Sequence, residues 1–486
     1  MPHPLFRLIP GSRRVRPALG SLVAGTAATA VAAAIVVPGF TAAAAAAGPG
    51  GAPGAWGPAT PLRYGGPASL AGNPALALNA DGLGVAVSDV GGGDAPGPRS
   101  DASAFTNGVF LDPLPFSTGS TRVGLGLGGV AAYGRGGLIA AGVRARADSS
   151  QAVLALGSLS ANRAQLGTVH PVGPAAMHAS APALAVNARG DAALVVPVCR
   201  DGGCRRSIIY LAVRRMGSSR ITTTRIAEPT RTLPRVAAAI NERGDALAVW
   251  TDNEAVNARV RTLGGWLRAT QRAGTTVRGS LAAPSASLSL HRAELVGWST
   301  QVVHEGDGTA GAVRVAQARD GGRFSAAAEL AQLPALSGRS ASGAVVRVDI
   351  DPNGLRHLAW TGYADGHFTV SSALLNGAAD SGTAKPVDRQ TLTAPGTDAV
   401  LEDLDTGADG SEVVTLRTGV RGDEPVDGHA VVAVATRASA DASYTVTALS
   451  AADELATSAQ TVLQPGRAIV AWGTAAAGAR YAERIG

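Results

Sequence analysis

The stretch RVAAAINERGDALAVWTDNEAVNARVRTLGGW, from Arg235 to Trp266, alternates short apolar runs with clusters of Asn, Asp and Gly. Runs this short, rich in alanine and valine and bounded by turn residues, predict β-strands rather than helices. The turn ERGD separates the first two runs, and the second run ends at Trp250. The stretch therefore predicts antiparallel strands joined by hairpin turns.

The same pattern returns along the chain at intervals of about 54 residues. The upstream copy PALAVNARGDAALVVPVC starts at Pro182, and its Gly190 corresponds to Gly244. The other units are centred on Gly82, Gly136, Arg292, Gly354, Gly410 and Gly466. Four strands per unit in eight units predict an all-β fold, a β-propeller of eight four-stranded blades. Seven blades are the alternative if the unit near Gly136 or Arg292 is not a blade.

The two ends of the repeat region complement each other. The chain ends in GARYAERIG, which matches a third strand without a fourth. The segment GAWGPATPLRYG, which begins at Gly54, resembles GGWLRATQRAG, which leads into a fourth strand. We expect this N-terminal strand to complete the last blade and so remove an open sheet edge. Residues 48–486 are therefore predicted to form one domain.

Residues 1–47 predict an export signal. A basic start that includes Arg13 and Arg14 precedes a long apolar run, and TAAAAAAGPG then supplies small residues for cleavage after about Ala47. The apolar run is also long enough for an uncleaved anchor. SRRVR resembles a twin-arginine signal, but the hydrophobic residues that usually follow are missing, which favours the general secretory (Sec) route. We expect a secreted or cell-surface protein with no further membrane contact.

The charge pattern argues against nucleic acid as a partner. The formal net charge is +6, and removal of the four arginines of the export signal, which contains no acid, leaves +2. No basic run of the kind that follows a phosphate backbone stands out. We expect a monomer whose partner is an extracellular protein or glycan.

The two cysteines, Cys199 and Cys204, lie in the short segment CRDGGC. Exported chains meet oxidising conditions, and a Gly-containing turn between two strands would place the two residues opposite each other. We therefore expect a hairpin disulfide. Zinc would need more ligands than this segment offers, and the C-x-x-C spacing of redox motifs is absent.

Three RGD tripeptides raise the question of cell adhesion. Arg189–Asp191 and Arg243–Asp245 fall at one repeat position, the turn between first and second strands. Glycine supplies positive φ in such a turn, and aspartate favours it through local hydrogen bonds. These two copies are predicted to be scaffold. The third copy, Arg421–Asp423, lies in a variable loop after a second strand.

The six tryptophans occupy two repeat positions. Trp250, Trp298, Trp360 and Trp472 end second strands, whereas Trp56 and Trp266 begin fourth-strand segments. Large side chains at fixed repeat positions are expected to pack between blades. A platform for ligand stacking is the alternative.

The loops between second and third strands vary in length, which is typical of functional segments on a rigid scaffold. They carry acidic residues that could form a rim suited to Ca²⁺ or to a basic partner. The candidate ligand-binding residues are Asp252, Glu254, Glu305, Asp307, Asp365, Asp423 and Glu424. No other cofactor is evident.

Two segments resemble metal-binding motifs without completing them. DIDPNG, from Asp349 to Gly354, resembles the start of a calcium loop, but Trp360 stands where a bidentate glutamate is needed. HEGDG, from His304 to Gly308, lacks the H-E-x-x-H spacing. We expect a hairpin turn and a loop, respectively.

No catalytic motif accompanies the repeat. The boxes of sialidase-like propellers and of quinoprotein dehydrogenases are absent, as are G-x-S-x-G, phosphate-loop and dinucleotide motifs. The core N-x-x-G-D-A-x-x-V-W resembles that of secreted bacterial β-propeller repeat proteins, which implies a fold and no functional residues. We predict a non-enzymatic protein that binds a protein, glycan or cell-envelope polymer through its loop face. The alternative is a polysaccharide hydrolase or lyase with carboxylates around the channel mouth.

Overall fold

A computed structural model describes most of the chain after position 53. The described residues are 54–62, 74–90, 99–118, 121–122, 129–145, 149–174, 178–199, 207–230, 234–252, 254–276, 283–300, 310–320, 322–335, 345–376, 385–421, 424–475 and 478–485. They form strands and turns, and none belongs to a helix long and apolar enough to cross a membrane. The expected export signal of residues 1–47 lies outside them, as does Cys204.

The stretch from Arg235 to Trp266, with the strand that follows it, forms one antiparallel sheet, ordered β18 (Val236–Ile240), β19 (Ala246–Asp252), β20 (Ala255–Arg261) and β21 (Gln271–Thr275). Strand β20 alternates half-buried and buried residues, whereas β19 is buried from Ala246 to Thr251. An inner strand is buried on both faces when other sheets cover both sides of its own sheet. The run of valine and alanine in β19 reflects this position.

The other sheets repeat this antiparallel order, and β13 joins two of them into one nine-stranded sheet among the described residues. Their strands are β1 (Thr60–Leu62), β2 (Ala75–Leu78), β3 (Gly84–Val90), β4 (Arg99–Thr106), β5 (Val109–Phe110), β6 (Leu114–Pro115), β7 (Ser117–Thr118), β8 (Thr121–Arg122), β9 (Val130–Tyr133), β10 (Gly137–Ala145), β11 (Ser150–Ser160), β12 (Arg163–Val172), β13 (His178–Ala179), β14 (Ala183–Val186), β15 (Ala192–Cys199), β16 (Ser207–Arg214), β17 (Ile221–Thr230), β22 (Ser285–Leu288), β23 (Glu294–Ser299), β24 (Gly311–Ala318), β25 (Ala328–Leu333), β26 (Val346–Ile350), β27 (Arg356–Ala364), β28 (His367–Asn376), β29 (Lys385–Thr391), β30 (Ala399–Thr406), β31 (Glu412–Thr418), β32 (Val420–Arg421), β33 (Glu424–Pro425), β34 (Val431–Arg437), β35 (Thr445–Ala448), β36 (Ala456–Gln464), β37 (Arg467–Thr474) and β38 (Gly478–Ile485).

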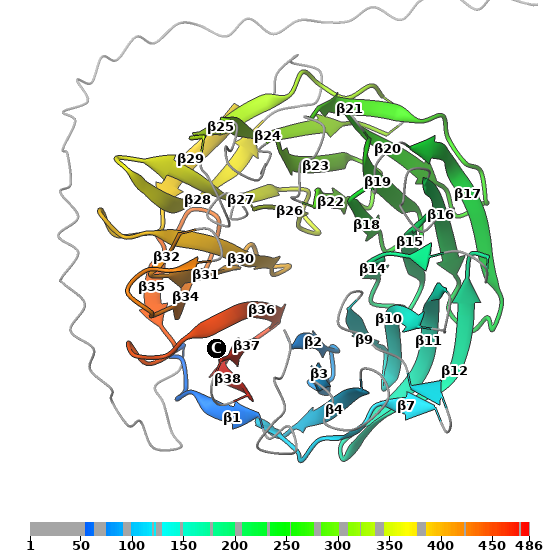
Figure 1. Ribbon diagram of the computed structural model, residues 1–486, viewed down its shortest axis with the longest axis horizontal. Coiled ribbons are helices and arrows are strands. Elements are labelled where there is room, and N and C mark those ends of the chain that lie inside the picture. The colour runs from blue at the N-terminus through cyan, green and yellow to red at the C-terminus, as the bar shows by residue number, and fades with distance from the viewer. Residues whose placement is uncertain are drawn as a thin grey trace, which may run out of the picture. The chain divides into compact units, whose positions relative to one another are not determined.

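The first strands of successive sheets contact one another in the order β2, β9, β14, β18, β22, β26, β30 and β36, and β36 contacts β2 again (Figure 1). Leu76 in β2 donates a backbone hydrogen bond of 3.1 Å to Gln460 Oε1 in β36. The N-terminal strand β1 pairs with β38, with Thr60 opposite Tyr481, so it completes the last sheet as expected. The chain therefore has a β-propeller-like all-β fold.

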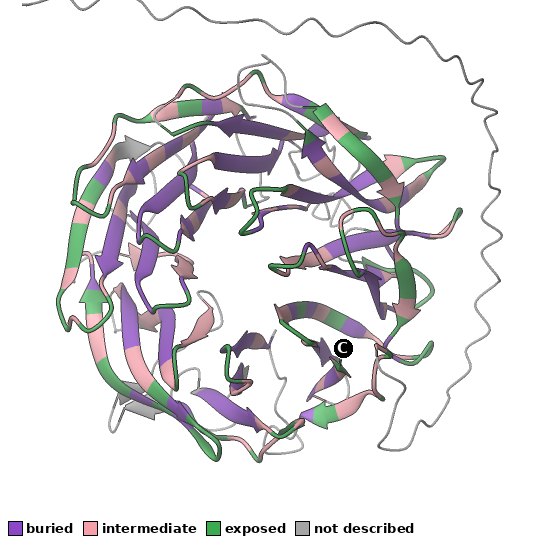
Figure 2. Cartoon of the chain, turned by 180° about the vertical axis from the view of Figure 1, so that it is seen from behind, coloured by how far each residue is buried: buried purple, intermediate pink, exposed green. Residues whose placement is uncertain are grey.

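Burial follows the order of strands within each sheet (Figure 2). Second strands such as β15 are buried along their whole length, whereas fourth strands such as β29 are largely exposed. Apolar side chains between neighbouring sheets form the core, as where Leu247 and Val249 in β19 share one cluster with Trp298 in β23. The fourth strands thus present most of the polar side chains to solvent.

The asparagine of the repeat fastens neighbouring sheets together. Asn241 Oδ1 accepts backbone hydrogen bonds from Arg243 and Asp245, and its Nδ2 donates to the Ser289 carbonyl in the next sheet at 2.9 Å. Asn187 Nδ2 donates in the same way to the Asn241 carbonyl, also at 2.9 Å. The asparagine at this repeat position therefore shapes the turn of its own sheet and also donates a hydrogen bond to the turn of the next sheet.

The first two RGD copies are scaffold, as predicted. The side chains of Asp191 and Asp245 are buried, and Asp245 accepts hydrogen bonds from the Leu263 N–H at 2.6 Å and from Arg292 Nε at 2.7 Å. A buried aspartate is not available to an adhesion receptor. Of the third copy, Arg421 lies on β32, whereas Gly422 and Asp423 lie outside the described residues.

Packing between sheets is confirmed for the tryptophans of the second strands. Trp298, Trp360 and Trp472 are fully buried, and Trp250 is 3% exposed. The same prediction is wrong for Trp266, which is 80% exposed. Its neighbour Leu267 bridges to Arg261 and packs against the core. Successive side chains in an extended segment point to opposite sides, so Trp266 points outward.

The remaining sequence predictions on turns and cysteines have mixed outcomes. DIDPNG forms a hairpin turn as expected: Asp351 Oδ1 accepts the Leu355 N–H at 2.8 Å, and Gly354 has φ +86°. Cys199 is buried at the end of β15. Because Cys204 lies outside the described residues, the hairpin disulfide stays a prediction. HEGDG also lies outside them.

Candidate functional site

The described acidic candidates lie on hairpins of three different sheets. Asp252 ends β19, Glu254 lies in the turn between β19 and β20, Asp365 follows β27, and Glu424 begins β33. Nowhere in the described part of the chain do three or more His, Cys, Asp or Glu residues gather closely enough to hold a metal ion. Outside that part lie Glu305, Asp307 and Asp423.

Two of the loops expected to be variable are tight turns. Asp252 pairs directly with Ala255, so only two residues connect β19 to β20. Ala364 pairs with His367 in the same way, which leaves Asp365 and Gly366 at φ values of +52° and +86°. Two successive left-handed residues are typical of a type I′ turn, which favours Asp-Gly. Turn geometry alone therefore accounts for the aspartate at position 365.

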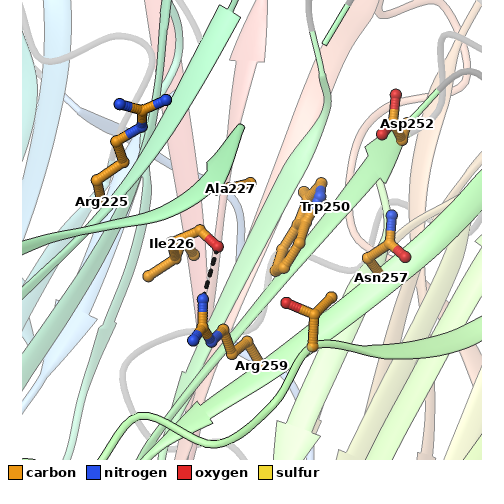
Figure 3. A pocket seen from close by; sticks show the side chains of 8 residues that line it. Arg225, Ile226, Ala227, Trp250, Asp252, Asn257 and Arg259 are labelled. Carbon is orange, nitrogen blue, oxygen red and sulfur yellow. Dashed lines mark hydrogen bonds between the residues drawn. The ribbon is translucent and has the colours of Figure 1, made fainter. Parts of the chain in front are cut away.

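Asp252 lies in a pocket of about 550 Å³ between two neighbouring sheets (Figure 3). One wall is the fourth strand β17, and the other is formed by β19 and β20. The lining residues are Arg225, Ile226, Ala227, Trp250, Asp252, Asn257, Arg259 and Thr270. The pocket is thus built by the opening stretch together with the outer strand of the preceding sheet.

Strand register explains how four of these side chains meet. Trp250 in β19 stands directly opposite Asn257 in β20. Asp252 and Arg259 each lie two residues further along their own strands, and alternate residues of a strand share one face. All four therefore project from the same face of the sheet, toward β17.

Arg259 spans the gap between the two sheets. Its Nε donates to the Arg268 carbonyl at 2.6 Å, and its Nη1 donates to the Ile226 carbonyl on β17 at 2.9 Å (Figure 3). Both acceptors are neutral, and no carboxylate among the described residues forms an ion pair with it. Burial lowers the pKa of this guanidinium. The pocket therefore contains a half-buried guanidinium bonded to carbonyl groups, together with the Asp252 carboxylate.

Trp250 and Trp360 differ from the two other tryptophans at this repeat position, and Trp360 Nε1 is buried without a hydrogen-bond partner among the described residues. Trp298 Nε1 donates to the Thr275 carbonyl at 2.8 Å, and Trp472 Nε1 donates to Glu454 Oε1 at 3.0 Å. The indole N–H of Trp250 has no acceptor among the described residues, and this side chain lines the pocket. The Trp250 side chain is 3% exposed.

A second group of ionisable side chains is sealed inside the protein. Glu412 accepts hydrogen bonds from His357 Nδ1 at 2.7 Å and from Arg437 Nη2 at 2.5 Å, and none of these side chains is exposed. Burial would raise the pKa of Glu412, but the His357 hydrogen bond and the charge of Arg437 hold it below its usual value. This cluster joins two sheets and offers no surface to a substrate.

Asp252 was predicted from the sequence as a candidate ligand-binding residue, whereas the other polar residues of the pocket were not. Arg225, Asn257 and Arg259 lie within strands, where a polar residue usually marks a solvated face. Their place opposite one another depends on the register of β17, which contains a bulge next to Tyr210 in its pairing with β16. In the sequence, the one signal for this pocket was Trp250, which lies two positions before Asp252.

No protein-family model matches the chain, and no curated protein matches its sequence. Among solved structures, an ulvan lyase of a new polysaccharide lyase family is 12% identical, with a TM-score of 0.46, over 85% of this chain and 94% of that one. Sqt1 of Chaetomium thermophilum is 11% identical, with a TM-score of 0.46, over 86% and 97%. A protein of unknown function from Dyadobacter fermentans is 11% identical, with a TM-score of 0.38, over 87% and 97%. These likenesses concern the fold alone.

Proposed function

We propose that the chain is an exported, non-enzymatic binding protein that recognises a glycan through the pocket at Trp250 and Asp252. The scaffold in this proposal is a closed propeller in which each of the eight sequence units supplies one blade. Its support is that the units near Gly136 and Arg292, the two least regular in sequence, each form four paired strands. The closing contact between β36 and β2 also agrees with it.

The observation that carries the proposal is the composition of the pocket. A volume of about 550 Å³ falls within the usual range for small-molecule sites. Its wall combines the Asp252 carboxylate, the Asn257 amide and the Thr270 hydroxyl with an indole N–H and guanidinium groups. Donors and acceptors this close together suit a ligand rich in hydroxyl groups, and this pattern favours a sugar over an apolar molecule.

The same composition argues against hydrolysis at this site. Glycoside hydrolysis normally uses two carboxyl groups on either side of the scissile bond. Among the described residues that line the pocket, Asp252 is the one carboxylate. A hydrolase or lyase therefore remains the second candidate, and it would need acids from other parts of the chain.

Titration calorimetry with neutral and acidic oligosaccharides tests the proposal. Asp252→Asn removes the pocket carboxylate, and Asp365→Asn is the matched control, since it removes the same charge from a turn of another sheet and asparagine tolerates positive φ. We expect saturable binding that Asp252→Asn weakens about tenfold and that Asp365→Asn leaves unchanged. Equal binding by all three proteins would place the site elsewhere.

Product analysis on the same mixtures separates binding from catalysis. We expect the oligosaccharides to be recovered intact after long incubation, with or without Ca²⁺. New reducing ends, or unsaturated ends, would favour the hydrolase or lyase. Oligosaccharide binding that requires Ca²⁺ and is abolished by EDTA would support the predicted acidic rim.

A further inference from the structure

We infer that the two turns carrying Met216, Leu263 and Trp266 form a docking surface for an anionic lipid bilayer. None of the three residues lines the glycan pocket, so the inference goes beyond the proposed function and does not rest on it. It departs from the sequence-based prediction of no membrane contact beyond the export signal, because the sequence did not show that these side chains are exposed.

Exposed apolar side chains are concentrated on these two turns. Trp266, Met216 and Leu263 are 80%, 58% and 53% exposed, and they are three of the four most exposed large apolar side chains among the described residues. Met216 follows β16, whereas Leu263 and Trp266 follow β20. Single exposed apolar residues are ordinary on a protein surface, but a group of them marks an interaction site.

The two turns lie beside each other on neighbouring sheets (Figure 1). Each joins the third strand of its sheet to the fourth. Arg215, next to Met216, donates from Nη1 to the Gly244 carbonyl at 2.5 Å and from Nη2 to the Leu263 carbonyl at 2.9 Å. One side chain therefore ties both turns together and brings their apolar tips to the same edge of the molecule.

The buried aspartates of the first two RGD copies fix the backbone of these turns. Asp191 Oδ1 accepts the Met216 N–H at 2.9 Å, and Asp245 Oδ1 accepts the Leu263 N–H at 2.6 Å. Met216 and Leu263 thus occupy the same repeat position. Because the scaffold holds their backbone, docking needs no ordering of the turns, which would otherwise oppose binding.

Four arginines supply positive charge around the apolar tips. They are Arg215, Arg220, Arg243 and Arg261, and none of them forms an ion pair among the described residues. A Cβ atom at Gly265 would lie 3.7 Å from Arg261 Nη2, so this guanidinium rests against the turn. Burial, and then the charge of the nearby Arg215, lower the pKa of Arg261.

The exposed acid on these turns is Glu242, which accepts the Ala188 N–H at 3.0 Å. Asp191 and Asp245 are buried, and each already pairs with an arginine of its own. Positive charge therefore exceeds exposed negative charge at this surface. Such an excess favours an anionic partner.

The combination of side chains favours a bilayer over an acidic protein. Tryptophan prefers the headgroup level of a membrane, and leucine or methionine beside it enters the acyl region. Arginine binds lipid phosphates while its apolar stem stays near the acyl chains. Separate apolar tips enter a fluid interface one by one, whereas a protein partner needs a continuous complementary surface.

The test is quenching of tryptophan fluorescence by vesicles of brominated phosphatidylglycerol, measured on the whole chain. Trp266 is the most exposed of the six tryptophans, and residues 1–47 contain no tryptophan, so the affinity of that segment for lipid gives no signal. We expect quenching in the wild type that Trp266→Phe abolishes. Brominated phosphatidylcholine vesicles should bind about tenfold more weakly, and salt should weaken binding to phosphatidylglycerol.

Variants that keep Trp266 separate the apolar and the charged contributions. We expect Leu263→Ser to weaken the vesicle affinity about tenfold, and the double variant Arg220→Gln, Arg243→Gln to weaken it about thirtyfold. Arg314→Gln on β24 and Val446→Ser on β35 are the matched controls, and each should leave the affinity unchanged. Melting temperatures equal to that of the wild type would show that the variants are folded.

Three results would overturn the inference. The first is no quenching by phosphatidylglycerol vesicles, or quenching that survives in Trp266→Phe. The second is equal quenching by phosphatidylcholine and phosphatidylglycerol, since the lipid charge would then play no part. The third is a fluorescence change with soluble polyglutamate but not with vesicles, which would indicate an acidic protein instead. Oligosaccharide binding is measured separately, so each of these results leaves the proposed function standing.

Discussion

Strand β19 follows one aspartate and ends on another, and the two have opposite surroundings. Asp245 precedes the strand, is fully buried and accepts hydrogen bonds from Leu263, Asn241 and Arg292. Asp252 ends the strand, is half-buried and lines the pocket. Burial would raise the pKa of Asp245, but its hydrogen bonds hold that pKa below the usual value. The first aspartate is therefore part of the scaffold, whereas the second lines the pocket.

The difference shows that residue type and repeat position do not by themselves decide a residue's role. The two ends of β19 differ in their surroundings, since Asp245 is enclosed by hydrogen-bond donors and Asp252 lies at a pocket between two sheets. At Asp245, the turn before β21 and the next sheet both reach the carboxylate. At Asp252, a pocket lies between the end of β19 and the adjacent fourth strand β17.

The sharpest test of this contrast is stability. Asp245→Ala should lower the free energy of unfolding by about 4 kcal/mol, because it leaves buried donors and the Arg292 charge without their acceptor. Asp252→Ala should change it by less than about 0.5 kcal/mol. Urea unfolding of both variants measures this difference. Similar losses in the two variants would show that both ends of the strand are scaffold.

The pH dependence of stability should differ between Glu294 and Asp245, because the pKa of the first carboxyl is raised and that of the second is lowered. Burial raises the pKa of Glu294, at the start of β23, to about 7; the charge of Arg268 reduces this effect and that of Asp320 adds to it. A raised carboxyl pKa means that the native state holds the proton more tightly than the unfolded state does. Its stabilising contribution is therefore complete below about pH 4.5 and is lost as the pH rises to about 7.

Glu294→Gln should remove that slope and stabilise the protein at pH 8 by at most about 3 kcal/mol relative to wild type. Asp245 acts in the opposite direction, since its lowered pKa gives a contribution that is lost as the pH falls. Urea unfolding at pH 4.5, 6 and 8 measures the effect of Glu294, and unfolding below pH 3.8 measures that of Asp245. A parallel pH profile in wild type and Glu294→Gln would contradict the assignment.

A smaller difference in stability is expected between substitutions of two tryptophans at one repeat position. Trp298→Phe should cost about 2 kcal/mol, because it leaves a gap in the core and the Thr275 carbonyl without its donor. Trp250→Phe should cost about 1 kcal/mol, since its N–H has no described partner and its edge faces the pocket. Thermal unfolding of the two variants gives the order. A larger loss at Trp250 would mean that this indole is a structural element like the others.

The sequence was sufficient for the repeat, the strand order within a unit and the closing strand β1. Turn glycines and the alternation of apolar residues depend on local geometry, which a single chain displays directly. The pocket required more, because Arg225 and Arg259 line it together only through the packing of two sheets. The exposed Trp266 was missed for a related reason: its neighbour Leu267 took the inward position.

The central claim is that one end of β19 is scaffold and the other is a ligand site. Its most direct test is to measure saccharide affinity and melting temperature together for Asp245→Asn and Asp252→Asn, each in the whole chain. We predict that Asp245→Asn lowers the melting temperature and leaves the affinity of the folded protein unchanged. We predict the reverse for Asp252→Asn. If Asp252→Asn instead lowered the melting temperature and left the affinity intact, the account would be contradicted.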